Sequence, residues 1–174
     1  MKLDVARYNR LAEDSRLTVR TITNNMQICG SILAAIDFGL AKSHFPLDRC
    51  STSRLQFLLA SVGRRPRNLE DASEKHLAAV KELVAMRSLV PPERWYNRGD
   101  YNEAIGARKA ADEAIAIAKA RQVALNNDIA KSDNLKQKQV LGEFLAIIAV
   151  MQRAAERMVE ATSLVIDAID GRGT

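Results

Sequence analysis

The chain contains few of the residues that turns and β-structure require. Its 174 residues include only 8 Gly and 4 Pro, and aromatic residues make up 5% of the total. Gly and Pro mark tight turns, and aromatic side chains are enriched in strands. This scarcity therefore argues against a sandwich or barrel of short strands. Abundant Ala, Leu, Glu, Lys and Arg favour helices instead, so we expect an all-α protein.

Residues that bind metals or carry out nucleophilic and acid–base chemistry are also scarce. The chain has two His and two Cys. Neither His44 nor His76 follows a carboxylate at the three-residue spacing that helical metal sites use. Cys29, His44 and Cys50 have no fourth ligand that would complete a zinc site. We therefore expect no metal, no cofactor and no enzymatic activity.

No apolar run in the sequence is long enough to cross a bilayer, which takes roughly 20 residues. The two longest apolar-rich runs are Ile28–Ala41, interrupted by Asp37, and Phe144–Met151. The first seven residues alternate charged and apolar side chains and do not form the continuous apolar segment of a secretory signal. We expect a cytoplasmic protein without a membrane span, with leaderless secretion as the alternative.

The basic excess of the chain lies in its first half. Residues 1–100 hold 16 Lys and Arg against 11 Asp and Glu, whereas residues 101–174 hold 10 of each. The basic residues are densest in a segment expected to be a loop. Guanidinium groups bind carboxylates and phosphates, although a net charge as small as +5 also fits a role in solubility. The expected partner-binding residues in this loop are Arg64, Arg65 and Arg67.

Apolar residues recur at three- and four-residue spacing in the first half, which is typical of amphipathic helices. The first such pattern spans residues 3–40 and predicts one long helix or two shorter ones. A short helix is predicted over 51–62 and another over 68–88, with Asn68 as its N-cap. These helices form a basic N-terminal half, residues 1–92.

The second half is predicted to begin with an aromatic connector, residues 93–102, which contains the only Trp of the chain. Trp95 and Tyr96 are expected to contact a partner, since aromatic residues are common in recognition surfaces. The alternative is that their rings anchor the connector onto the bundle.

Residues 103–170 are predicted to form a long helical hairpin. Its first helix, 103–131, is rich in Ala. The reversal is expected among the Asn, Ser and Asp residues between 126 and 134, since these side chains compete with the helical backbone and cap the next helix. One continuous helix is the alternative, because no strong helix breaker is present. One face of the first helix allows close approach and is expected to bind a partner through Ala111, Ala118 and Leu125.

The last helix, predicted over 140–169, has the strongest pattern in the chain. Apolar residues alternate at three- and four-residue spacing over about four heptads, as in a coiled coil. This seam consists of Leu141, Phe144, Ile148, Met151, Ala155, Met158, Thr162, Val165 and Ile169. Further apolar residues widen the seam, so the helix should contact at least two neighbours. We therefore predict a helical bundle of about five helices in a single domain, residues 1–174.

Three short segments resemble known motifs. Ile36–Lys42 contains the Asp-Phe-Gly of protein kinases, but only 35 residues precede it, too few for the rest of that fold. Residues 11–26 resemble the helix-turn-helix of bacterial DNA-binding regulators, although Arg16 stands where the turn normally has Gly. Residues 125–151 resemble the C-terminal helix of type III secretion filament and needle-tip proteins, which polymerise through such helices, and the first hundred residues show no counterpart.

These observations predict a protein that acts through protein–protein contact. The expected roles are those of an assembly, adaptor or secretion-associated component, and coiled-coil-like contacts would produce a homo-oligomer. A small DNA-binding regulator that dimerises through the C-terminal hairpin is the alternative, and nucleic acid would then be its partner.

Overall fold

The computed structural model describes residues 4–15, 24, 27, 56–57, 59–60, 65–86, 89 and 98–171. These residues contain helices, turns and no strand, which confirms the all-α prediction. Four continuous helices lie in this part of the chain: residues 5–15, α3 (Arg65–Ala85), α4 (Arg98–Lys131) and α5 (Leu135–Asp170). Positions 24, 27, 56, 57, 59 and 60 are also helical, so the expected total of about five helices is matched in part.

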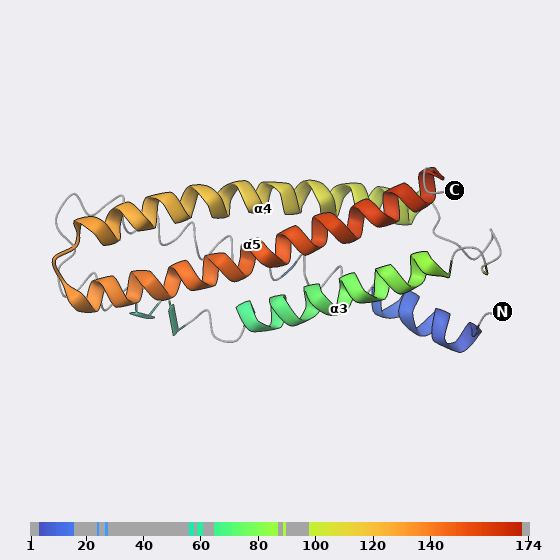
Figure 1. Cartoon of the computed structure of the whole chain (residues 1–174), viewed down its shortest axis with the longest axis horizontal. Helices are drawn as coiled ribbons and strands as arrows, with labels where there is room; N and C mark the ends of the chain where they lie inside the picture. Colours follow the sequence, from blue (N-terminus) through green and yellow to red (C-terminus); the bar gives the residue numbers. More distant parts are fainter. Residues whose placement is uncertain are drawn as a thin grey trace.

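Helices α4 and α5 form the predicted hairpin and run antiparallel along most of the length of the molecule (Figure 1). Helix α4 continues through Asn126 and Asn127, so the reversal is confined to residues 132–134. Asn134 is the N-cap of α5, and its side-chain oxygen accepts hydrogen bonds from the backbone N–H groups of Lys136 and Gln137 at 3.0 and 3.3 Å. Two free backbone donors at the helix start are thereby satisfied.

Gly171 ends α5 in the left-handed conformation, with φ 71° and ψ 11°, and its N–H donates to the carbonyl of Asp167. A residue without Cβ adopts this conformation at little cost, which makes it a common end to a helix. Figure 1 also shows that the last described residues of the chain lie at the same end of the molecule as its N-terminal helix.

The helices begin earlier than the sequence patterns predict. Helix α3 starts at Arg65 and not after Asn68, so the expected basic loop is instead helical at positions 65–67. Pro66 lies in the first turn, where the missing N–H costs no intrahelical hydrogen bond. Helix α4 starts at Arg98, with Asp100 in its first turn near the positive end of the helix dipole. The proposed aromatic connector is therefore helical over its second half.

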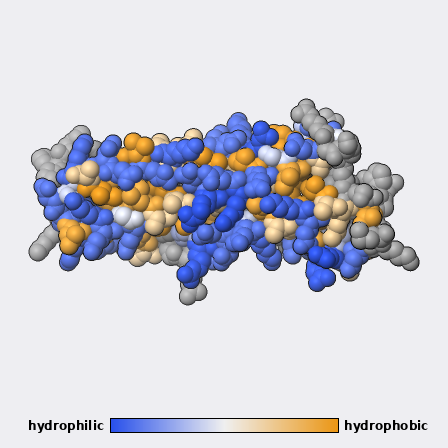
Figure 2. Space-filling model, viewed as in Figure 1, coloured by the Kyte–Doolittle hydropathy of each residue, from blue (hydrophilic) through white to orange (hydrophobic). Residues whose placement is uncertain are grey.

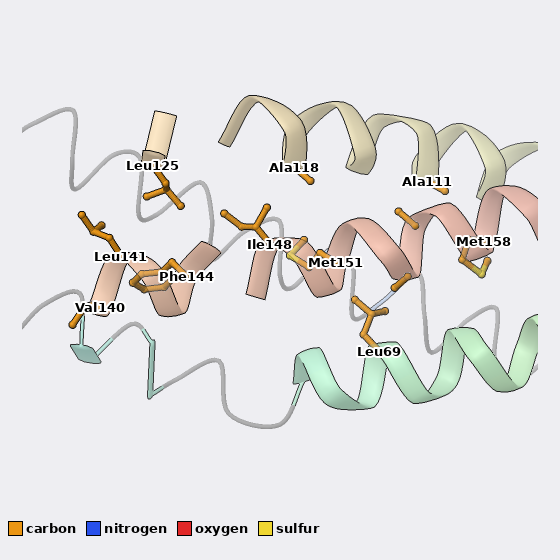
Figure 3. Packing of buried hydrophobic residues seen from close by; sticks show 12 residues of the cluster. Leu69, Ala111, Ala118, Leu125, Val140, Leu141, Phe144, Ile148, Met151 and Met158 are labelled. Atoms are coloured by element: carbon orange, nitrogen blue, oxygen red, sulfur yellow. The ribbon is translucent and has the colours of Figure 1, made fainter. Parts of the chain in front are cut away.

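Helix α5 packs against both other long helices, which confirms that it contacts at least two neighbours. Figure 3 shows α4 contributing Ala111, Ala118 and Leu125 to one side of α5, while α3 contributes Leu69 to another. The predicted seam of α5 is buried from Leu141 to Val165. The buried members of this main core are Leu69, Ala111, Ala118, Leu125, Val140, Leu141, Phe144, Ile148, Met151, Ala154, Ala155 and Met158.

Two smaller apolar clusters continue from the main core. One joins all three long helices near the end of α5 and contains Val80, Ala104, Ala161, Val165 and Ile166, with Tyr101 packed against it. The other joins the N-terminal helix to α3 and contains Tyr8, Ala12 and Leu83, with Leu11 and Met86 at its edge. Within the described ranges, few apolar side chains therefore join the N-terminal helix to α3.

Candidate contact surface on helix α4

The expected partner-binding face of α4 is buried inside the chain. Ala111 and Ala118 are 1% exposed and Leu125 is 4% exposed, all in contact with the core along α5. Small side chains at a seven-residue spacing let α5 approach closely and cover this face. The prediction that a partner binds there is therefore corrected, because the chain itself already occupies the face.

The other expected partner-binding residues are spread over different segments. Arg65 and Arg67 lie in the first turn of α3, where Arg67 is exposed. Arg64, Trp95 and Tyr96 lie outside the described residues. Tyr101, from the helical half of the expected aromatic connector, is half-buried against the cluster of Val80 and Val165, as an anchoring role would require.

Helix α4 carries large apolar side chains on the sides that α5 does not cover. Ile105 is 43%, Ile117 46% and Val123 64% exposed. A surface helix that covers one core normally has polar residues opposite its apolar stripe. Figure 2 shows that apolar groups also reach the surface on the face drawn there, interleaved with hydrophilic ones. Among the described residues, α4 therefore has large apolar side chains on sides that α5 does not cover.

Helical geometry divides these exposed residues between two strips on either side of the buried face, because each residue turns the helix by about 100°. We call the first the Ile117 strip. Its members repeat every seven residues, and all are exposed: Glu103, Ala110, Ile117, Ala124 and Lys131. We call the second the Val123 strip. Its members are also exposed: Ile105, Lys109, Asp112, Ala116, Lys119 and Val123.

Polar contacts between helices hold α4 in place on α5. The amide nitrogen of Gln122 on α4 donates to the side-chain oxygen of Gln152 on α5 at 2.8 Å, and within α5 the amide of Gln152 donates to Glu156 at 3.0 Å. At the hairpin turn, the buried Ser132 hydroxyl donates to the side-chain oxygen of Gln137. These contacts lie at the middle and at the closed end of the hairpin, and together with the buried core they set which face of α4 meets α5.

A second polar cluster joins α3 to α5. Arg157 donates to the backbone carbonyl of Glu70 at 3.2 Å and to the hydroxyl of Ser73 at 3.3 Å. Arg153 and the Glu70 carboxylate form an ion pair at 3.4 Å, and Lys81 pairs with Glu160 at 3.3 Å. Sequence reasoning missed these pairs, since the residues are far apart in the chain and no local spacing connects them. These contacts join α3 to α5, and because the two ion pairs are partly exposed their contribution to stability is modest.

The pKa of His76 is clearly displaced from its ordinary value. The side chain is 2% exposed, and burial lowers its pKa from 6.5 to about 4, while a hydrogen bond with the backbone of Ser15 partly opposes that change. The imidazole is therefore neutral near pH 7. Its position at the contact between the N-terminal helix and α3 gives it a structural role.

The described residues provide no cluster of His, Cys, Asp and Glu that could hold a metal ion. Within the same ranges, no helix combines the length and apolar character needed to span a bilayer. The proposed helix-turn-helix falls mainly on residues 16–26, most of which lie outside the described ranges, as do Cys29, His44, Cys50 and the Asp-Phe-Gly segment. These predictions therefore stay predictions.

Comparison with known protein families, with curated protein sequences and with solved structures found no match for this chain.

Proposed function

We propose that this chain is a non-enzymatic helical-bundle protein that works through protein–protein contact, as an assembly, adaptor or secretion-associated component. One observation carries the proposal: α4 presents apolar residues outward after its inward face has been fully used by α5. Exposed apolar residues grouped on one element commonly mark a site where another protein binds. The surface proposed for contact comprises the Ile117 and Val123 strips.

The rigidity of the hairpin supports this role. A contact surface is most effective when its side chains are held in place before binding, because less conformational freedom is then lost. Both ends of α4 are fixed, one by the Ser132 turn and the other by the cluster around Ala104. The Gln122–Gln152 hydrogen bond holds the middle.

The ionisable groups of the described residues favour contact over catalysis. Catalytic groups commonly have displaced pKa values and lie where a substrate can reach them. The pKa of His76 is displaced, but the side chain is 2% exposed and forms a hydrogen bond with the backbone of Ser15. The imidazole is therefore out of reach of a substrate in the folded chain.

A photo-crosslinking amino acid placed on α4 tests the proposal in cells that express the protein. Positions Ile117 and Val123 should each yield discrete covalent adducts with a protein chain. Exposed Glu143 on α5 provides the matched control and should yield none or a diffuse background. Adducts of equal amount from α5 and α4, or none from either α4 position, would contradict the proposal.

A further inference from the structure

The Ile117 strip has a symmetry that the Val123 strip lacks. Ile117 lies midway between Ala110 and Ala124, seven residues from each, and midway between Glu103 and Lys131, fourteen residues from each. At 1.5 Å per residue, the acidic and basic ends lie about 21 Å on either side of Ile117. Along the strip the side chains are therefore acidic, small, large, small and basic in turn, and the two opposite charges are equally far from its centre.

We propose that this strip binds the same strip of a second copy of the chain, with the two α4 helices antiparallel and a two-fold axis at Ile117. This inference rests on the proposed function, since it names the partner of one part of that surface, the Ile117 strip. A two-fold interface uses one patch on both subunits, so each contact occurs twice. Glu103 then lies opposite Lys131 of the second copy at both ends, and Ala110 lies opposite Ala124 of that copy.

The side chains of the strip suit a close helix pair. The two Ala positions on either side of Ile117 let the helix backbones approach, while the two Ile117 side chains meet at the axis. A seven-residue repeat on each helix is kept in register by a left-handed crossing of about 20°. The whole strip, from the second turn of α4 to its last residue, can therefore contribute to one continuous interface.

The Val123 strip is less suited to the same arrangement. An antiparallel pairing that places Ile105 level with Val123 of a second copy also places Lys109 level with Lys119 of that copy, because both pairs share one midpoint. Like charges at the same level repel and weaken association. Charge complementarity thus selects the Ile117 strip, and the Val123 strip serves as an internal control.

A charge-exchange cycle tests this register. Glu103→Lys and Lys131→Glu, each alone, place two pairs of like charges in the interface and should raise the dimer dissociation constant roughly tenfold at low salt. The double variant restores opposite charges at both ends and should return the constant to that of the original protein. Sedimentation velocity over a concentration series measures all four proteins, and circular dichroism checks that each keeps its helix content.

Matched substitutions on the other strip provide the control. Asp112→Lys and Lys119→Glu make the same charge changes on the Val123 strip and should leave the dissociation constant unchanged. A protein that stays monomeric at every concentration would overturn the proposal. So would a double variant that associates no better than the single ones, or a control pair that weakens association equally.

A disulfide trap tests the two-fold axis independently. In a chain with Cys29→Ser and Cys50→Ser, the added substitution Ile117→Cys places two thiols at the axis, and mild oxidation should link most of the protein as a dimer. Val123→Cys in the same background should remain mainly monomeric. Equal linkage at both positions, or none at Ile117, would overturn the arrangement.

The two proposals fail in distinguishable ways. If photo-crosslinking from Ile117 captures only a different protein and the purified chain is monomeric, the contact function stands and self-pairing does not. If neither α4 position yields an adduct and the chain is monomeric, both proposals fail.

Discussion

The hairpin of α4 and α5 and the N-terminal helix docked on α3 are built from similar amphipathic helices but are attached very differently. The hairpin shares a core that extends along most of α5, from Val140 to Ile166. Among the described residues, the N-terminal helix meets α3 through the cluster of Tyr8, Ala12 and Leu83, the exposed Arg7–Glu82 ion pair and the buried imidazole of His76. The difference indicates that, among the described residues, the burial that stabilises this fold is greatest along α5 and smaller where the N-terminal helix meets α3.

Removing a large side chain from the hairpin core should have the greatest effect on the folded state. Phe144 is 0% exposed, so Phe144→Ala creates a cavity beside α5 and should lower the free energy of unfolding by about 3 to 5 kcal/mol. Urea denaturation followed by circular dichroism measures the change.

Leu135→Ala, at a 71% exposed position of the same helix, is the matched control for Phe144→Ala and should change stability by less than about 0.5 kcal/mol. Similar losses from the two variants would show that the hairpin does not depend on this core.

Acid should weaken the N-terminal attachment. The pKa of His76 is about 4 in the folded chain and 6.5 in the unfolded chain, so the unfolded chain binds more protons between these values. The free energy of unfolding should therefore be unaffected by His76 above pH 6.5 and fall as the pH drops towards 4. The full loss would be about 3 kcal/mol, since each pKa unit corresponds to about 1.4 kcal/mol.

Urea titrations at pH 7 and pH 4.5 should show a larger loss in the original protein than in His76→Gln, which removes this titration. Hydrogen exchange shows where in the chain the stability is lost, because the amides of residues 5–15 should lose protection in acid before those of α5 do. Equal pH dependence in the two proteins would show that His76 is not responsible.

The smallest effect is expected at the surface of the same contact. Arg7 and Glu82 form an ion pair at 2.8 Å, but their side chains are 54% and 46% exposed. Arg7→Ala should cost about 0.2 to 1 kcal/mol, and the cost should shrink in high salt. Thermal denaturation at low and high ionic strength checks this. A cost above that of Phe144→Ala would reverse the comparison between the two regions.

Sequence periodicity predicted the last helix well because α5 is the centre of the core. Nearly every member of its seam packs against a neighbouring helix, so the apolar positions of the sequence coincide with the buried positions of the helix. The reversal before α5 was also predictable in type, since Asn134 is a strong N-cap residue. Its position was not, because Asn126 and Asn127 are equally good turn residues that here lie inside α4.

Helix α4 was harder to interpret because Ala is a good helix former at any position and marks no particular face. Two faces of α4 carry small and apolar residues at a seven-residue spacing, one at Ala111 and Ala118 and the other at Ala110 and Ile117. Sequence alone offers no means to choose which face meets α5. The first was expected to bind a partner, and the structure buries it instead.

The sequence by itself determined that this protein is helical and where its strongest apolar seam lies, and it favoured a helical hairpin over residues 103–170. Those properties follow from local spacing and from the propensities of consecutive residues. Only the tertiary structure decided which side of α4 is buried against α5 and which sides are exposed. That choice depends on the side chains that α5 and α3 bring together from positions far apart in the chain, and it moves the candidate contact surface of α4 from the face of Ala111 and Ala118 to the two strips beside it.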